Sequence, residues 1–503
     1  MVTAIIALLL GTGALATPPT HAADRRLEAA AVDSYVAAAM QSRRVPGLAL
    51  AIVEGDRVVS THGFGYADAT GRPVTPATQF RIGSNTKGFT ALAVMQLVEQ
   101  GKVALEAPIR QYLPGFRLAD DKAAGQITVA HLLYHTSGIP GEAGYDTFRQ
   151  PHLTLGEYVQ RLSGVCLDRP VGSAFEYSNA NYNVLGLLVE AVSRESYAGY
   201  VQRHIFAPLR MTHSSAAPLE SPGGGMAQGY KWWFGWPRPA TDLFSAANAP
   251  AGYVTSTAED LSHYLVAQMN DGRYQGASVL SPAGIVRIHA EGAHTRFAAH
   301  GVEVGYAMGW GIADLDGSSI VTHTGATFAF ASEQIIDMRR RLAVVVLTNV
   351  EDQLSSDEHV RAIASGVLRR LSGLPPASKG LSAARVYLLI DPVLLILSIA
   401  GFVTLLRVLF RLGLAARSEP PQGRRLTAIR AAVEVSAAVF VVALVPRILG
   451  ISWSLLLTAQ PDLAWWALGM EGLAFLTGSI RTAALGVGVG ERAAVTRSVG
   501  VNG

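Results

Sequence analysis

Three long apolar stretches near the C-terminus constrain the fold of this chain more than any other feature. They run from Tyr387 to Leu406, from Ala431 to Gly450 and from Leu463 to Leu485. Each has about 20 residues, the length that an α-helix needs to cross a bilayer. The third begins near Trp465-Trp466, a pair typical of a membrane interface. We therefore expect an all-α membrane region over 386–503 with three transmembrane helices; the alternative is a buried helical bundle.

The arginines around these stretches predict an orientation. From Arg385 onward the chain has 11 arginines, no lysine and 6 acidic residues. Six of the arginines lie between the first two stretches, whereas the segment from Ile451 to Asp462 contains no basic residue. Basic loops stay in the cytoplasm, so the arginine-rich loop is predicted to be cytoplasmic. The sequence thus predicts a multi-pass cell-membrane protein whose residues before Tyr387 lie outside the cytoplasm.

The N-terminus independently predicts export. Ala4 to Leu10 is an apolar run, followed by small residues and Thr20-His21-Ala22. The run is too short to span a bilayer but suits a secretory signal peptide. We expect a signal peptide over 1–23, cut near Ala22 or Ala23; the alternative is a simple N-terminal helix.

Between these segments we predict one exported domain over 24–371 and a linker over 372–385 that contains Pro375-Pro376. Only 16% of the residues are charged, against about 25% in an average soluble domain, and the apolar tail accounts for much of the deficit. A net charge of +3 is too small to indicate a nucleic-acid partner. The single cysteine, Cys166, excludes an internal disulfide framework and a cysteine-based zinc cluster.

Strand patterns occur at both ends of this domain. Two strands are predicted early, over Leu48–Val53 and Arg57–Gly65, after an N-terminal helix over Asp24–Ser42. Three more are predicted late: Tyr306–Ala313, Phe330–Asp337 and Leu342–Thr348. Helical patterns lie between the two groups. This order predicts an α+β domain with one antiparallel sheet, closed by pairing of the two ends of the domain.

A possible nucleophile precedes the helical pattern that begins at Phe89. Ser84 and Lys87 are three residues apart, which places both side chains on one face of a helix. A serine hydroxyl needs a neighbouring base to become a nucleophile, and a desolvated lysine can serve as one. The alternative is a helix cap followed by a solvated lysine, because this spacing is common by chance.

Two further motifs follow along the chain. Tyr177-Ser178-Asn179 precedes a predicted helix over Tyr182–Val192, and His323-Thr324-Gly325 lies between strand-like segments. Taken alone, the first motif is equally consistent with a helix cap beside a packed aromatic ring. The second is equally consistent with a structural histidine on a strand.

In this order, the three motifs resemble those of the serine β-lactamase and penicillin-binding DD-peptidase superfamily, in its class C-like branch. The segments Ile127–Gly138 and Ala249–Gly252, together with Ser256–Leu261, are also similar to this family. The resemblance covers residues 24 to 371. It implies a β-lactamase/transpeptidase-like fold, in which an antiparallel sheet with flanking helices accompanies a helical subdomain.

The resemblance also implies a role for each motif residue. Ser84 would be the acylated nucleophile, and Lys87 would help take its proton. Tyr177, as a phenolate or a hydrogen-bonded phenol, would shuttle protons to the leaving group and from the deacylating water. Asn179 would hold the substrate's amide oxygen and orient Lys87. The remaining implied site groups are the substrate-binding residues His323, Thr324 and Gly325 and the backbone N–H groups of Ser84 and Ala326, which would form the oxyanion hole.

One residue departs from the β-lactamase pattern. Class C β-lactamases usually have lysine where this chain has His323. A histidine is only partly charged at neutral pH, which would weaken its attraction for a substrate carboxylate. Related forms occur in DD-carboxypeptidases, D-aminopeptidases and esterases of the superfamily. Efficient β-lactamase activity is therefore not expected, whereas acyl transfer through Ser84 is.

Other signals predict no metal and no cofactor. His131 and His135 have the spacing of two ligands on one helix face, but Leu132 stands where a metalloprotease motif needs glutamate. A structural role for both histidines is expected. The aromatic segment Trp232–Trp236 is predicted to contact the bilayer, line a substrate cleft or form a packed loop.

The sequence thus predicts an exported, membrane-anchored serine hydrolase acting on amide or ester bonds. A small molecule or a D-amino-acid peptide of the cell wall would be the substrate, and membrane lipid would surround the tail. Two alternatives are a membrane sensor that is acylated by penicillin-like or muropeptide ligands without efficient turnover, and a non-catalytic scaffold. The complete set of Ser84, Lys87 and Tyr177 disfavours the scaffold.

Overall fold

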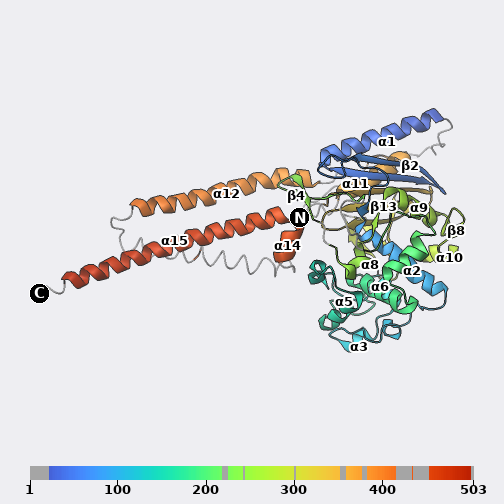
Figure 1. Ribbon diagram of the computed structural model, residues 1–503, viewed down its shortest axis with the longest axis horizontal. Helices are drawn as coiled ribbons and strands as arrows, with labels where there is room; N and C mark the ends of the chain where they lie inside the picture. The colour runs from blue at the N-terminus through green and yellow to red at the C-terminus, as the bar shows by residue number, and fades with distance from the viewer. Residues whose placement is uncertain are drawn as a thin grey trace.

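The computed structural model describes residues 22–217, 225–241, 244–299, 302–315, 317–351, 358–376, 382–414, 433 and 453–499. All but the last two residues of the predicted signal peptide, and nearly all of the second predicted membrane stretch, lie outside these residues. The described part combines an α+β domain with a C-terminal group of helices (Figure 1). The predicted fold class is confirmed.

An eight-stranded antiparallel sheet forms the centre of the domain, in the order β2-β1-β14-β13-β12-β11-β10-β9. The early strands β1 (Gly47–Glu54) and β2 (Arg57–Gly65) form a hairpin, and β1 pairs with β14 (Leu342–Thr348). Leu48 lies opposite Thr348 in this register. The predicted closure of one sheet by the two ends of the domain is confirmed.

Strand β1 is apolar along its length because both faces of the sheet are covered. Ala49, Ala51 and Val53 point into one hydrophobic core, and Leu48 and Leu50 point into a second core. Successive side chains of a strand alternate between faces, so a strand buried on both sides reads as a continuous apolar run. The two cores position different helices on the two faces.

Helices α1 (Ala22–Arg43) and α11 (Glu358–Leu371) cover one face of the sheet (Figure 1). The other face carries α2 (Thr86–Glu99), α9 (Ala258–Met269) and a helical subdomain that contains α6 (Asn179–Ser193). The other helices of the domain are α3 (Asp121–Ala124), α4 (Val129–Leu133), α5 (Leu155–Arg161), α7 (Tyr197–Val201), α8 (Ala249–Gly252) and α10 (Pro282–Ile288). The other strands are β3 (Phe80–Arg81), β4 (Gly229–Trp233), β5 (Trp236–Ala240), β6 (Thr255–Ser256), β7 (Arg273–Tyr274), β8 (Ala277–Ser278), β9 (Phe297–Ala299), β10 (Val302–Tyr306), β11 (Gly311–Leu315), β12 (Ser318–Ala326) and β13 (Ala331–Asp337).

One strand prediction is wrong. The sequence predicts a single strand over Tyr306–Ala313, but the chain turns there and forms β10 and β11 as a hairpin. Gly309 makes the turn with a φ of +80°, a value that suits glycine. A Cβ on Gly309 would lie 2.7 Å from the backbone carbon of Lys87, so the turn packs tightly on α2. Apolar periodicity does not reveal such a turn.

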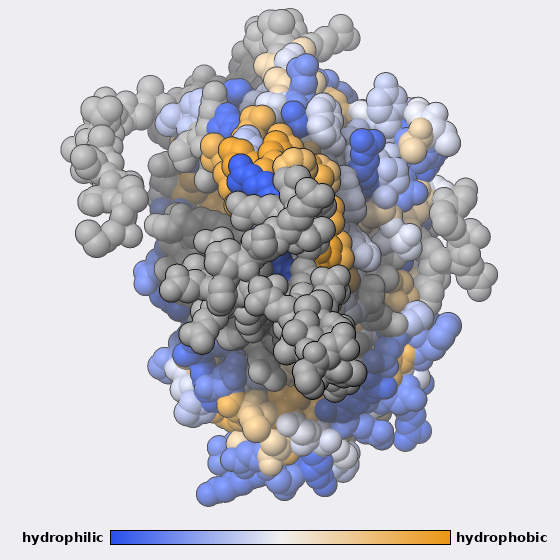
Figure 2. Space-filling view, turned by 90° about the vertical axis from the view of Figure 1, so that its left-hand side faces the viewer, coloured by the Kyte–Doolittle hydropathy of each residue, from blue (hydrophilic) through white to orange (hydrophobic). Residues whose placement is uncertain are grey.

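The C-terminal helices are α12 (Ala383–Leu414), α14 (Trp453–Ala459) and α15 (Pro461–Val499). Two segments, Ala383–Phe410 and Pro461–Ala483, are long and apolar enough to cross a membrane. Figure 1 shows α12 and α15 extending together from the domain, and Figure 2 shows hydrophobic residues gathered on the side from which they project. The Trp466 indole donates a hydrogen bond to Ser398 Oγ (2.9 Å), which joins the two helices.

Candidate active site

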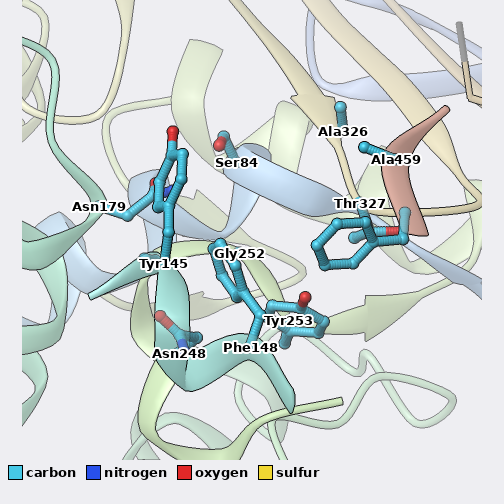
Figure 3. Close-up of a pocket in the computed structure, with 12 residues that line it drawn as sticks. Ser84, Tyr145, Phe148, Asn179, Asn248, Gly252, Tyr253, Ala326, Thr327 and Ala459 are labelled. Atoms are coloured by element: carbon cyan, nitrogen blue, oxygen red, sulfur yellow. The ribbon is translucent and has the colours of Figure 1, made fainter. Parts of the chain in front are cut away.

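Ser84 lies in a short 3₁₀ turn between β3 and α2. The preceding Gly83 has a φ of +52°, and a Cβ at this position would lie 2.2 Å from the backbone nitrogen of Ala326. Only glycine tolerates both conditions. The turn therefore lies directly against the end of β12, and Ser84 faces the same space as Ala326 (Figure 3).

Lys87 lies in the first turn of α2, with its side chain completely buried. Its Nζ is 3.0 Å from Ser84 Oγ and donates hydrogen bonds to Asn179 Oδ1 (2.7 Å) and to the carbonyl oxygen of Ala251 (2.8 Å). Burial lowers the pKa of Lys87 well below its usual value of 10.5. A neutral amine has two N–H groups for the two carbonyl oxygens and keeps a lone pair for the proton of Ser84. This geometry suits a general base.

Tyr177 approaches the nucleophile from the other side. Its hydroxyl lies 2.9 Å from Ser84 Oγ, and burial raises the pKa of this phenol above its usual value, so the group is protonated. Its ring packs on His135, with 4.4 Å between the ring centroids. Nδ1 of His135 accepts hydrogen bonds from Ser178 N–H and the Asn181 side chain, which fixes the loop before α6. Burial holds the pKa of His135 well below its usual value, so this support is neutral.

Asn179 is the first residue of α6, because this helix begins three residues earlier than the sequence predicted. Its Oδ1 faces Lys87, and the residue also lines the cavity at Ser84. The Nδ2 group is therefore the end of the amide that is left for a substrate oxygen. The position fits both roles that the resemblance implied for Asn179, which remain predictions.

His323 is a neutral group. Its Nδ1–H donates to the carbonyl oxygen of Thr324 (2.7 Å), and its Nε2 accepts from the hydroxyl of Tyr306 (3.1 Å). Burial, with a smaller contribution from the nearby Lys87, lowers the pKa of His323 to about 3. A neutral imidazole offers no charge to a substrate carboxylate.

The next two residues of β12 are also fully engaged. The Thr324 hydroxyl donates to the carboxylate of Glu333 (2.6 Å), a buried residue directly opposite on β13. At Gly325 a Cβ would lie 1.9 Å from the carbonyl oxygen of Ile82. Gly325 therefore allows β12 to lie against the turn that carries Ser84. The only side-chain donor of Thr324, its hydroxyl, is committed to Glu333.

A cavity of about 360 Å³ opens at Ser84 (Figure 3). Four aromatic residues, Tyr145, Phe148, Tyr253 and Phe328, form much of its wall. The other lining residues are Ser84, Asn179, Asn248, Ala251, Gly252, Ala326, Thr327 and Ala459. None of these described residues carries a formal charge, so the cavity suits an uncharged, largely apolar group.

The structure brings the predicted Ser84, Lys87, Tyr177 and Asn179 together and places β12 beside them. Sequence reasoning missed other contributors, including the Ala251 carbonyl, the aromatic wall, Tyr306 and Ala459. A signal existed only for Ala251, which lies in a segment that carried the resemblance. The others come together through contacts between distant parts of the chain.

The weaker signals also have positions. Nδ1 of His131 accepts from the Thr128 N–H in a helix capping box, and His135 supports Tyr177, so the two histidines serve different structural purposes. Among the described residues, no group of three or more potential ligands forms a metal site. Trp232 and Trp233 belong to the hairpin of β4 and β5, where buried Trp232 stacks on Tyr387 of α12. Cys166 is exposed.

Comparison with known proteins agrees with this geometry. The sequence model of the family described as Beta-lactamase matches residues 32–367. The chain belongs to this family. It is 32% identical over 288 residues to "Penicillin-binding protein 4" of Amycolatopsis lactamdurans, which covers 56% of this chain and 75% of that protein.

Two other similarities extend the comparison. "Protein flp" of Staphylococcus aureus (strain N315) is 28% identical over 327 residues, 64% of this chain. The match spans 63% of that relative's length, a little under two thirds. The structure of the octameric penicillin-binding protein homologue from Pyrococcus abyssi aligns with a TM-score of 0.59 and 27% identity, covering 70% of this chain and 79% of that one.

Proposed function

We propose that this protein is a serine hydrolase that forms an acyl-enzyme at Ser84 on an ester or amide substrate. The observation that carries the proposal is the position of Ser84 Oγ, which lies 3.0 Å from the buried amine of Lys87 and 2.9 Å from the protonated phenol of Tyr177. A nucleophile within hydrogen-bond reach of a base and an acid is the arrangement that acyl transfer needs.

In the proposed mechanism, Ser84 Oγ attacks the substrate carbonyl while its proton moves to Lys87 Nζ. The Ser84 and Ala326 N–H groups would stabilise the oxyanion, a contribution of about 2.7–4 kcal/mol per donor in comparable enzymes. Tyr177 then gives its phenolic proton to the leaving oxygen or nitrogen and regains one from the Lys87 ammonium. A water molecule then attacks the acyl-enzyme and gives its proton to Lys87. That proton passes from Lys87 to Ser84 Oγ as the intermediate breaks down, which releases the acid and restores neutral Lys87 and free Ser84.

The electrostatics favour a substrate without a carboxylate next to the reacting bond. His323 is neutral, the Thr324 hydroxyl donates its hydrogen bond to Glu333, and the described residues that line the cavity carry no charge. Carboxylate recognition normally uses a cation or free hydrogen-bond donors. We therefore favour uncharged esters and amides over peptides that end in D-Ala-D-Ala and over penicillins.

We also propose that the enzyme is exported and anchored by its tail. Two apolar helices and the arginine-rich segment between the first two predicted spans support this proposal. Reporter fusions after Gly401, near Arg424 and at the C-terminus would test the topology. A periplasm-positive signal from the fusion near Arg424 would refute it.

The decisive experiment is Ser84→Ala in the full chain, assayed by labelling with a fluorescent fluorophosphonate and by hydrolysis of p-nitrophenyl butyrate. We expect both to be abolished, whereas the control Ser173→Ala, at an exposed serine, retains them. A panel of butyrate ester, D-amino-acid amide, D-Ala-D-Ala peptide and cephalosporin then tests the substrate class. Undiminished labelling of Ser84→Ala would refute the nucleophile, and preference for the carboxylated substrates would refute the electrostatic argument.

A further inference from the structure

One wall of the cavity comes from the C-terminal helices. Ala459, the last residue of α14, lines the cavity together with Thr327 and Phe328 (Figure 3). Ala459 is more than 130 residues beyond the other lining residues in the sequence, and it lies outside the region that matches the family, residues 32–367. The catalytic domain and the tail thus build the cavity jointly.

Buried polar contacts hold this wall in place. Lys231 of β4 donates to the carbonyl oxygen of Ala459 (2.8 Å) and to the carboxylate of Glu351 (3.1 Å), and both charged side chains are buried. A lysine at the carbonyl end of a helix satisfies a group that has no partner within the helix. Close by, the fully buried Asp462 accepts a hydrogen bond from the backbone N–H of Phe234 (2.9 Å). The β4–β5 hairpin therefore fixes the junction of α14 and α15 at two points.

The same junction is where an apolar helix leaves the domain. The candidate span Pro461–Ala483 begins two residues after Ala459. Trp465, which is 57% exposed, follows the first residue of α15, Pro461, by four residues, or about 6 Å at the rise of an α-helix. Tryptophan is typical of the headgroup level of a membrane. The other apolar helix, α12, starts beside the same hairpin, through the stacking of Tyr387 on Trp232.

We propose that this site takes its substrate from the membrane surface, and that the substrate is an amphiphilic ester or amide with a hydrophobic acyl chain. The inference rests on the proposed acyl-enzyme chemistry at Ser84. The reacting carbonyl enters the uncharged cavity, while the chain passes along the wall made by Ala459 and Phe328 toward the level of Trp465. The tail thus selects the substrate in addition to anchoring the enzyme.

The test compares two esters with the full chain reconstituted in phosphatidylcholine vesicles. The substrates are p-nitrophenyl butyrate, which is soluble, and p-nitrophenyl decanoate, which partitions into the vesicles. We expect kcat/KM to be at least about tenfold higher for the decanoate, because each buried methylene adds to binding. Ala459→Trp fills the part of the cavity beside this wall and should lower the decanoate-to-butyrate ratio of kcat/KM about tenfold or more. The control Thr458→Trp places the same side chain on the neighbouring position and should leave the ratio unchanged.

A second variant tests the hydrogen bond from Lys231 to Ala459 without leaving one member of the Lys231–Glu351 ion pair buried alone. Lys231→Met combined with Glu351→Gln releases the junction and should also lower the ratio. Ratios unchanged in both Ala459→Trp and the double variant would overturn the inference, as would faster hydrolysis of the butyrate by the unchanged protein. If the protein without substitutions shows neither fluorophosphonate labelling nor ester hydrolysis, the result is a different one, because it would refute the proposed chemistry itself.

Discussion

Replacing Lys87 by methionine tests the central feature of the site, a lysine kept neutral by burial. The Lys87 side chain is completely buried, and burial is what lowers its pKa below 10.5. An unfolded chain binds a proton at this lysine below pH 10.5, whereas the folded chain does not until the pH falls to its lower folded pKa. Between these two pKa values the unfolded state binds more protons, so the free energy of unfolding falls as the pH falls. Lys87→Met removes this dependence.

The expected magnitude follows from the contacts of Lys87. Above pH 10.5 the variant should be less stable, because the buried Ala251 carbonyl loses its donor, which costs about 1–3 kcal/mol. Below pH 10.5 the unchanged protein loses about 1.4 kcal/mol per pH unit relative to the variant. This relative loss continues until the pH reaches the lower folded pKa of Lys87, so the difference in stability shifts toward the variant as the pH falls, although the variant is inactive. The two stability curves should therefore not be parallel.

Urea unfolding of the detergent-solubilised chain, followed by tryptophan fluorescence between pH 7.5 and pH 9.5, would measure both curves. Between the folded and unfolded pKa values of Lys87 the difference should change by about 1.4 kcal/mol per pH unit. The matched control is Lys102→Met, which removes an exposed lysine and should give a curve parallel to that of the unchanged protein. Parallel curves for Lys87→Met would refute the reasoning, because they would mean that Lys87 stays protonated in the folded enzyme.

Three further substitutions test other parts of the site. Tyr177→Phe keeps the ring on His135 but removes the hydroxyl at Ser84, so kcat for p-nitrophenyl butyrate should fall by about 10²–10⁴-fold. A loss smaller than tenfold would argue against proton transfer by Tyr177. Gly325→Ala places a Cβ 1.9 Å from the carbonyl oxygen of Ile82, and the resulting shift of β12 should lower kcat by about 10²–10³-fold. The circular dichroism of the variant should be unchanged, and full activity would show that the position of β12 is unimportant. His323→Gln removes a group whose pKa of about 3 in the folded state lies below its ordinary 6.5. Thermal unfolding should therefore show a smaller loss of stability in the variant than in the unchanged protein on acidification from pH 6.5 toward pH 3. An equal loss in the two proteins would contradict the buried, neutral state of His323.

The sheet and the catalytic motifs were predictable because their signals are local. The strand patterns over Leu48–Val53 and Arg57–Gly65 predicted β1 and β2, and the pairing of β1 with β14 followed from strands at both ends of the domain. Ser84 and Lys87 are three residues apart on one face of a helical turn, so a contact between them was one of the two interpretations that the spacing allowed. The resemblance that the three motifs carry then implied that Tyr177 and Asn179 join them.

The cavity wall was not predictable, because its residues meet only through tertiary packing. Phe148, Tyr253 and Phe328 come from three separate segments, and each is an ordinary apolar residue in its local context. The turn at Gly309 interrupted a predicted strand because it packs on the backbone of Lys87, a contact that strand periodicity does not encode. Ala459 lies in a segment that was interesting for its lack of basic residues, and nothing in that pattern points to Ser84.

The histidine at position 323 connects the chemistry of the site to its substrate. Two neighbouring amines in a buried site would each disfavour the charge of the other, and here the second group is an imidazole that stays neutral. Lys87 therefore owes its lowered pKa to burial, and the ring centroids of Tyr177 and Tyr182 lie 4.7 Å and 5.6 Å from its Nζ. A site that keeps its base neutral by excluding water and charge is suited to a hydrophobic acyl group. The junction of α14 and α15 adds Ala459 to the cavity wall at the start of an apolar helix, which is where the proposed amphiphilic substrate would enter from the membrane.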